Sequence, residues 1–275
     1  MRTMVEYIPM SRKAYTTPII TLLTDFGLTD PYVGVMKGVI LGIVPEATLV
    51  DLTHDIPAQD VGCAAFVLST AIDYFPPGTI HVIVVDPGVG SQRRPIAVKT
   101  DQAFFVAPDN GVLTLALVRQ PPTEIVHLTN PAYWLPEVST TFHGRDIFAP
   151  VAAHLARGVP ITDLGTPIRE IVYLPARVPT QDADGKTLGE IQHIDRFGNC
   201  ITNIPASMLD PNISLIVKVA GQSIPGISST YATVEPGAPV ALIGSSGFLE
   251  IAIRNGNAAE QFSIEVGDPV VIEPQ

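Results

Sequence analysis

The chain has little charge, few cysteines and no basic run. Of its 275 residues only 16% are charged, two are Cys and one is Trp. Acidic residues outnumber Lys and Arg, which gives a net charge of −11 and an isoelectric point near 4.8. An acidic chain without a run of Lys and Arg is not expected to bind nucleic acid. A cationic ligand suits it better.

The cysteines and the N-terminal segment bear on location. Cys63 and Cys200 are far apart and belong to no CxxC pair, which favours reduced, packed thiols over a disulfide framework. Residues 1–17 contain no apolar run long enough for a signal peptide or a membrane span, and we interpret them as a flexible leader. We therefore expect a cytoplasmic protein with no membrane partner.

Apolar side chains are abundant. They make up 46% of the residues, and the mean hydropathy is +0.31. This is more apolar surface than one monomer of this size needs to bury, so the composition predicts a homo-oligomer with sizeable interfaces.

The first part of the chain alternates apolar strand patterns with helix patterns. This order predicts an α/β domain with a mostly parallel central sheet. The run from Ile80 to Val85 is unbroken and is bounded by Pro and Gly, as expected of a central strand buried on both faces. Strands are expected at 18–23, 48–52, 80–85, 96–100, 103–107 and 124–128, and helices at 32–43, 60–75, 113–118 and 147–156.

A second domain follows a break in this pattern. Pro175, Pro179 and the polar run 181–186 predict a boundary, with an α/β domain over 18–180 and a second domain over 187–275. Short strands alternate with turns in the second domain and no helix pattern of useful length occurs. A small antiparallel barrel or sandwich fits this pattern.

Polar side chains follow the predicted strands of the first domain. Asp25 and Asp86 each end a strand, Arg93 follows Asp86 closely, and His143 lies in a later loop. Ligands of open α/β sheets bind outside the carboxyl ends of the strands, so these residues are candidates for a site. Each also has a structural explanation, as a helix cap, a turn residue or a hydrogen-bonded histidine.

The second domain offers two further candidate loops. Asp195 and Asn199 lie in a turn after a strand, and Gly244–Gly247 is a glycine-flanked loop whose N–H groups suit an anion such as a carboxylate.

A metal site is an alternative interpretation. His54 and Asp55, with Asp25 and Asp86, would form a set of oxygen and imidazole ligands at strand ends, as metallohydrolases use. No HxH, HExxH or CxxC pattern supports it. The glycines after Asp86 also lack the lysine of a phosphate-binding P-loop.

Four motifs, taken together, resemble the S-adenosyl-L-methionine (SAM) hydroxide adenosyltransferase family, whose relatives include the fluorinase and the chlorinase. They are TDFG at 24–27, DPGVGS at 86–91 with Arg93, FHGRD at 142–146 and DRFGN at 195–199. The resemblance runs from about Pro18 to the C-terminus. It implies an N-terminal α/β sandwich followed by a C-terminal antiparallel β-barrel, in a homotrimer with active sites between subunits.

The resemblance also implies a reaction. SAM would be cleaved by water or hydroxide at C5′ to adenosine and L-methionine, with SAM as the small-molecule substrate and no cofactor or metal. Where the halogenases have tyrosines, this chain has Asp86 and His143, which suit a water nucleophile better than a halide. The halogenase tryptophan near the ribose corresponds to Gln59.

Residue roles follow from the same resemblance. Asp86, Arg93 and His143 would position and activate the water. Substrate binding would fall to Asp25 at the ribose hydroxyls, Asp195 at the methionine ammonium, Phe197 and Asn199 at the adenosyl group, and Ser245 at the methionine carboxylate. A SAM-dependent halogenase, an adenosine- or SAM-binding sensor without turnover, and a metal-dependent hydrolase using His54 and Asp55 are the alternatives.

Overall fold

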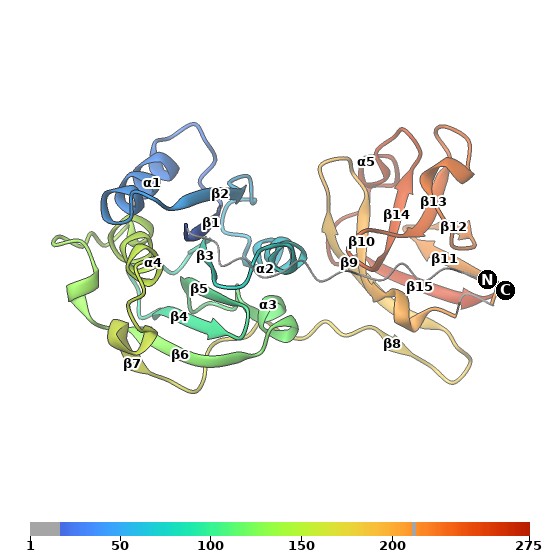
Figure 1. Ribbon diagram of the computed structural model, residues 1–275. Coiled ribbons are helices and arrows are strands. Elements are labelled where there is room, and N and C mark those ends of the chain that lie inside the picture. Colours follow the sequence, from blue (N-terminus) through green and yellow to red (C-terminus); the bar gives the residue numbers. More distant parts are fainter. Residues whose placement is uncertain (1–16, 211–212) are drawn as a thin grey trace, which may run out of the picture. The chain divides into compact units, whose positions relative to one another are not determined.

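The computed structural model describes residues 17–210 and 213–275 (Figure 1). These form two compact units. The first contains the described residues up to Ala64 together with Ala71–Val172, and the second contains Ala65–Thr70 and Tyr173–Gln275. The leader predicted for 1–17 lies, except for Thr17, outside the described residues. The domain limits at residues 180 and 187 stay a prediction.

The first unit is built on a seven-stranded sheet of order β2-β1-β3-β5-β4-β6-β7. Parallel pairing joins β1 to β2, β1 to β3 and β3 to β5, while β4 is antiparallel to both β5 and β6. Because β7 is in turn antiparallel to β6, all strands except β4 and β7 run in one direction. The predicted α/β class is confirmed. The strands are β1 (Ile19–Thr24), β2 (Thr48–Thr53), β3 (Thr79–Val84), β4 (Pro95–Thr100), β5 (Ala103–Pro108), β6 (Pro122–Leu128) and β7 (Gly165–Pro167).

Strand β3 is the central strand that its apolar run predicts. All six of its residues are buried, and it lies between β1 and β5. The strand ends at Val84, one residue before the predicted end, although Val85 is still fully buried. Asp86 is therefore the first residue after the buried part of this strand, at the start of the following loop.

Three α-helices in the described residues lie wholly within this unit: α1 (Tyr32–Ile43), α3 (Thr114–Arg119) and α4 (Ala149–Ala156). Helix α2 (Val61–Ala71) is divided, since its residues Ala65–Thr70 belong to the second unit. The helix expected over 60–75 ends at Ala71 and continues as a 3₁₀ turn, Ile72–Tyr74, since two prolines follow Phe75 and disfavour helical backbone there. The helix expected at 147–156 begins at Ala149, after a π-helical turn over Gly144–Phe148. Further 3₁₀ turns are Pro131–Tyr133 and Ile161–Leu164.

Helices α1 and α4 pack on one another, and their apolar faces complete the core of the first unit. Met36 and Ile40 of α1 are fully buried and belong to the same core cluster as Ile20 and Leu22 of β1. The strand ends that carry the candidate residues are thereby fixed to a rigid support. No helix in the described part of the chain is long and apolar enough to cross a membrane.

The second unit is an antiparallel sheet of order β12-β11-β15-β9-β10-β14-β13, with β8 added beside β9. Its end strands β12 and β13 contact each other, so the sheet nearly closes. The expected small β-barrel is confirmed. The strands are β8 (Thr180–Gln181), β9 (Thr187–Ile194), β10 (Cys200–Pro205), β11 (Leu215–Val219), β12 (Gln222–Pro225), β13 (Pro239–Ile243), β14 (Phe248–Ile253) and β15 (Pro269–Pro274).

Sequence patterns did not reveal the short elements of this unit. Strands β8 and β12 have two and four residues, and helix α5 (Ala258–Phe262) has five. Such lengths are too short for a period to be read. Helix α5 is nevertheless defined at both ends, by Asn257, whose side chain accepts from Glu260 N, and by Ser263 in the left-handed conformation. Two 3₁₀ turns, Ala206–Met208 and Tyr231–Thr233, complete the unit.

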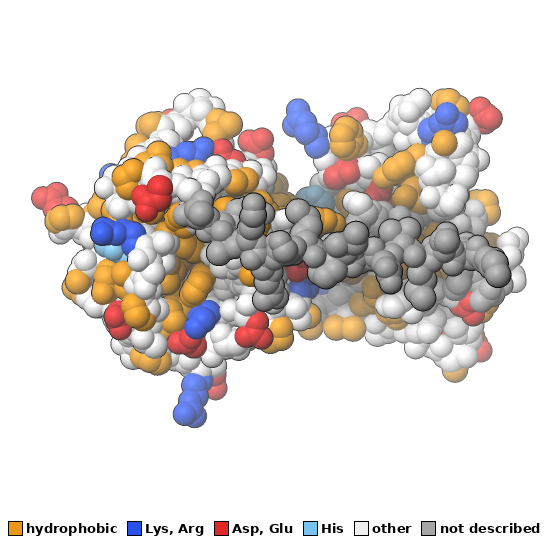
Figure 2. All heavy atoms as spheres, viewed as in Figure 1, with side chains coloured by type: hydrophobic (Ala, Val, Ile, Leu, Met, Phe, Trp, Pro, Cys, Tyr) orange, Lys and Arg blue, Asp and Glu red, His pale blue; other side chains and the backbone are white. Residues whose placement is uncertain are grey.

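On the visible face, Lys and Arg side chains stand apart from one another (Figure 2). Several pair with carboxylates: Lys37 with Asp51, Lys99 with Glu124, Arg119 with Asp73 and Arg177 with Glu190. On this face, the described residues form no large cluster of positive charge of the kind that attracts a polyanion.

Candidate active site

Asp25 follows β1 directly and is held by a backbone group. Its Oδ2 accepts a hydrogen bond of 2.8 Å from the Gln59 N–H. Gln59 has φ +67°, a left-handed conformation that costs energy for a residue other than glycine. The strained turn after β2 thus directs an amide toward the Asp25 carboxylate.

Asp86, Arg93 and His143 lie together. Arg93 Nε donates to Asp86 Oδ1 at 3.0 Å and its Nη2 donates to Oδ2, so the pair is bidentate. The same Nη2 lies 3.1 Å from His143 Nδ1. The Asp86 and Arg93 side chains are only 5% and 6% exposed, and the guanidinium also lies over the ring of Phe148, its Cζ 5.4 Å from the centroid.

Burial and this pairing shift both titratable groups. Burial raises the pKa of the Asp86 carboxyl above its ordinary value, although Arg93 opposes the rise. Burial, with a further contribution from Arg93, lowers the pKa of His143, against the opposing effect of Asp86 and Asp146. His143 is therefore neutral near pH 7.

The contact with Arg93 also fixes the tautomer of the neutral ring. A guanidinium can only donate, so Nδ1 of His143 accepts and Nε2 carries the proton. Arg93 Nη1 is buried and has no hydrogen-bond partner among the described residues. Arg93 Nη1 is therefore a donor that the contacts of this group do not use.

Three motifs of the first unit converge around this group. The Phe26 ring of TDFG packs edge-on to Phe142 of FHGRD, with centroids 5.8 Å apart. Gly90 of DPGVGS, at φ +76°, approaches the segment before His143 so closely that a Cβ there would lie 2.5 Å from the Thr140 carbonyl oxygen. Only glycine fits this position.

The segment before His143 is held by Asp146. This fully buried carboxylate accepts from Ser139 N at 2.8 Å and from Ser139 Oγ at 2.7 Å, and Arg145 Nε donates to it at 2.5 Å. Ser139 Oγ in turn accepts from Phe142 N at 3.0 Å. Sequence reasoning did not identify Ser139. The sequence did contain a signal for it, because Ser139 lies three residues before FHGRD and is a possible hydrogen-bond donor to Asp146, the last residue of that motif.

The residues of the metal hypothesis are not assembled. His54 Nδ1 lies 2.9 Å from Thr24 Oγ and its Nε2 lies 3.0 Å from Asp51 Oδ1, so the ring contacts neither Asp25 nor Asp55. Within residues 17–210 and 213–275, no three His, Cys, Asp or Glu side chains are arranged to hold a metal ion.

The four candidates of the second unit lie in two turns. Asp195 Oδ1 accepts from the N–H groups of Phe197 and Asn199, both at 2.9 Å, and its Oδ2 accepts from Asn199 Nδ2 at 2.9 Å. Phe197 is 75% exposed, a large fraction for an aromatic side chain. Ser245 lies in the separate turn between β13 and β14. The hydrogen bonds thus join the first three of these residues in one turn.

The cysteines are packed thiols. Cys63 is half-buried and Cys200 is buried. Burial raises the pKa of the Cys63 thiol to about 11 and that of Cys200 to about 12. Neither thiol is a reactive thiolate near neutral pH.

Comparison with known proteins relates this geometry to a family. Residues 20–165 match the model of the SAM hydroxide adenosyltransferase N-terminal domain, and residues 189–271 match that of its C-terminal domain. A protein of Thermus thermophilus named (R)-S-adenosyl-L-methionine hydrolase is 41% identical, over 91% of this chain and 98% of its own length. A fluorinase of Nocardia brasiliensis is 28% identical, over 93% of this chain and 97% of its own.

A solved structure resembles the whole fold. The crystal structure of an uncharacterized conserved protein from Thermotoga maritima is 39% identical and superimposes with a TM-score of 0.87, over 92% of this chain and 99% of that one. With both domain models matched in order, the chain belongs to the SAM hydroxide adenosyltransferase family.

Proposed function

We propose that this protein hydrolyses SAM to adenosine and L-methionine by attack of water at C5′. Relatives that are 34% to 41% identical are named (R)-SAM hydrolases. From this name we infer that the substrate of this protein is also the SAM epimer with the R configuration at sulfur. The observation that carries the proposal is the buried group of Asp86, Arg93 and His143, with an unpaired donor on Arg93.

The substrate's own chemistry defines what the site must do. Attack at C5′ breaks the C5′–S bond, and the bond's electron pair goes to sulfur, so methionine leaves as a neutral thioether. No general acid is needed. The site has to hold a water oxygen in line with the C5′–S bond and take one proton from it, and such alignment contributes a large part of the rate.

The three residues divide this work. Arg93 Nη1 donates to the water oxygen and stabilises the charge of the developing hydroxide. His143 orients the water and, through the contact of its Nδ1 with Arg93 Nη2, holds the guanidinium in place. Asp86 takes the proton: burial raises its pKa, and a carboxylate has lone pairs beyond the two that Arg93 uses. The proton then passes to solvent.

Substrate binding draws on both units. Asp25 accepts hydrogen bonds from the ribose hydroxyls, and Asp195 pairs with the methionine ammonium. Phe197 and Asn199 contact the adenosyl group, and Ser245 holds the methionine carboxylate. The family resemblance supports these roles, and the 75% exposure of Phe197 supports an apolar contact made on binding.

The proposal includes a homotrimer in the cytoplasm, with active sites between the first unit of one subunit and the second unit of its neighbour. The high apolar content supports assembly, and packed, unreactive cysteines support a reducing compartment. No cofactor or metal enters the proposed reaction.

The decisive experiment incubates the pure protein with each sulfonium epimer of SAM in heavy-oxygen water, with chloride and a chelator present, and identifies the products by mass. We expect methionine and adenosine carrying the heavy oxygen, from the R epimer. Chlorinated adenosine would indicate a halogenase instead. Activity lost with the chelator and restored by metal would indicate a metal-dependent hydrolase. Unchanged substrate would indicate a sensor.

A further inference from the structure

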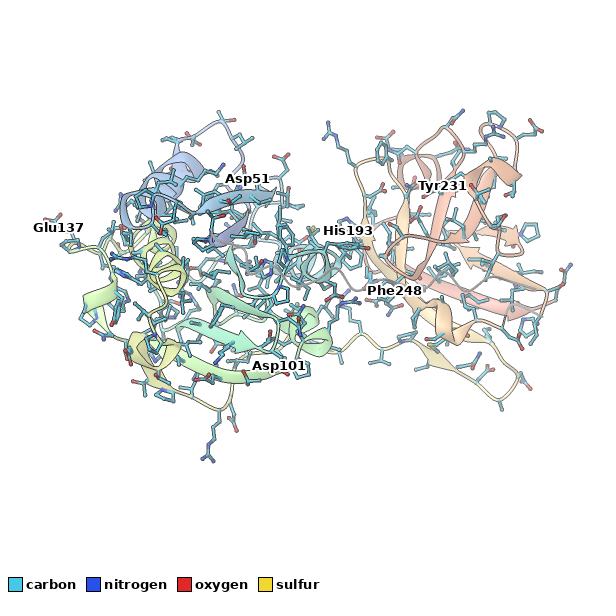
Figure 3. All side chains as sticks on the ribbon, in the orientation of Figure 1. Asp51, Asp101, Glu137, His193, Tyr231 and Phe248 are labelled. Carbon is cyan, nitrogen blue, oxygen red and sulfur yellow. The ribbon has the colours of Figure 1, made fainter. Side chains whose placement is uncertain are left out.

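A continuous polar network runs through the edge of the first unit's sheet, behind the Asp25 loop. Lys37 Nζ donates to Asp51 Oδ2 at 2.7 Å, and Asp51 Oδ1 lies 3.0 Å from His54 Nε2. His54 Nδ1 then lies 2.9 Å from Thr24 Oγ. Asp51, labelled in Figure 3, lies on β2, and Thr24 ends β1, so the network joins three elements.

The hydrogen-bond accounting fixes the direction of the network. Asp51 is ionised, because its contacts with Lys37 and His54 outweigh the effect of burial and lower the pKa of its carboxyl. An ionised carboxylate favours the proton on Nε2 of His54, although this contact is an ion-pair distance rather than a well-aligned hydrogen bond. Nδ1 is then an acceptor, and the Thr24 hydroxyl donates to it. The Thr24 oxygen remains available to accept.

Both groups at the end of this network hold the loop that contains Asp25. Thr24 Oγ accepts from Phe26 N at 3.2 Å, and the His54 carbonyl oxygen accepts from Gly27 N at 2.8 Å. The residues on both sides of Asp25 are therefore fixed. Thr24 of the network precedes it, and the hydrogen-bonded Phe26 and Gly27 follow it. The two residues that do the anchoring, Thr24 and His54, are buried.

We propose that His54, oriented by Asp51, is a positioning residue for Asp25 and thereby sets the enzyme's recognition of the ribose hydroxyls. The inference rests on the ribose role of Asp25 in the proposed function. His54 does not touch substrate in this account. It fixes the tautomer and rotamer of Thr24, and through Thr24 the backbone from which the carboxylate extends. A displacement of about 1 Å at such a group is sufficient to cost up to about 100-fold in rate or affinity.

A second buried histidine supplies a matched control. His81 on β3 makes the same kind of contact, with its Nδ1 2.7 Å from the hydroxyl of Thr21 on β1. It is fully buried and stacks on Phe105, with ring centroids 5.2 Å apart. Thr21 lies in the middle of β1, away from the strand end. Replacement of His81 therefore disturbs a buried Thr–His pair in the same sheet without disturbing the Asp25 loop.

The test measures kcat and KM for SAM and for its 2′-deoxy analogue. The variants are His54→Ala, Asp51→Asn, His81→Ala and Asp25→Ala. A hydrogen bond from the 2′-hydroxyl to a charged carboxylate separates the two substrates by about 10- to 100-fold in the unmodified protein. We expect His54→Ala to raise KM for SAM by about tenfold, to reduce this preference by a similar factor, and to change kcat by less than about threefold. Asp51→Asn, at a half-exposed position that tolerates change, shifts the preference in the same direction by a smaller factor.

The controls separate the possible failures. His81→Ala should keep the full preference for SAM even where it lowers the melting temperature, and Asp25→Ala should abolish it. A full preference in both His54→Ala and Asp51→Asn, with loss in Asp25→Ala, would overturn the positioning role and leave the ribose role intact. A full preference in Asp25→Ala would overturn the ribose role itself. Equal loss in His54→Ala and His81→Ala would reduce both histidines to general structural residues.

Discussion

At the scale of single residues, two neighbouring arginines form similar ion pairs in different surroundings. Arg93 is paired with Asp86 beside His143, whereas Arg94 Nε donates to Asp109 at 2.8 Å. Asp86 and Asp109 are both nearly buried, at 5% and 2% side-chain exposure. The two pairs are alike in chemistry, and each has a histidine nearby, His143 beside the first and His127 beside the second. Among the described residues, Arg93 differs in its 3.1 Å contact with the histidine ring and in its buried Nη1 without a partner.

Asp86→Asn tests the proposed proton acceptor. The amide keeps the shape and a contact to Arg93 but cannot take a proton, so we expect kcat to fall by about 100-fold or more while KM changes by less than about threefold. Steady-state kinetics with SAM measure this. Asp109→Asn is the matched variant, which should lower the melting temperature and keep kcat. A comparable loss of kcat in both variants would show that the effect is structural.

The pH dependence of activity tests the state of His143. Because its pKa is lowered below the ordinary value of 6.5, the ring binds a proton only at lower pH and is neutral at pH 7. Protonation of Nδ1 would repel Arg93. We expect kcat/KM to be constant near neutral pH and to decline only below pH 6.5. His143→Gln should lose most activity and keep only the part of this decline that comes from protonation of Asp86. A midpoint at or above 6.5 in the unmodified protein would contradict the neutral donor.

At the scale of elements, the closest approach in the site is that of the DPGVGS turn to the segment before His143. Gly90→Ala would place a methyl group against the Thr140 carbonyl oxygen and strain a φ of +76°. Gly78→Ala strains a similar φ, +88°, in open space. Left-handed backbone alone costs about 1–2 kcal/mol. We therefore expect Gly78→Ala to lose about 1–2 kcal/mol of stability and to keep a normal kcat. Gly90→Ala should lose more stability and also have a lower kcat. Urea unfolding measures the stability of each variant, and steady-state kinetics measure kcat. Equal behaviour of the two variants would mean that this approach does not position His143.

Sequence patterns predicted the strands and helices better than the turns between them and the contacts between distant residues. The central strand β3 and the barrel followed from apolar runs and turn residues, because those patterns are local. The π-helical turn over Gly144–Phe148 and the left-handed Gln59 were not foreseen, since each is imposed by packing against segments distant in the chain. Likewise, Asp86, Arg93 and His143 were each recognisable, but their contact required the fold. His54 was identified as a possible metal ligand, whereas in the structure its ring contacts Thr24 and Asp51.

At the scale of the whole molecule, buried His81 links stability to pH. Burial lowers its pKa from 6.5 to about 4. The unfolded chain therefore binds a proton that the folded protein refuses, and stability is complete above pH 6.5 and is lost as the pH falls from 6.5 toward 4. The loss amounts to about 3 kcal/mol at pH 4. Urea unfolding at pH 7 and pH 4.5 should show a smaller change for His81→Gln than for the unmodified protein. An identical change in both would mean that His81 does not contribute to this loss.

The hydrogen bond between Asp25 and residue 59 has a consequence for divergence within the family. Its donor is a main-chain N–H, which every residue except proline possesses. The side chain at position 59 can therefore change without loss of this anchor. The corner beside the Asp25 carboxylate can thus be remodelled by single substitutions while the carboxylate itself stays fixed.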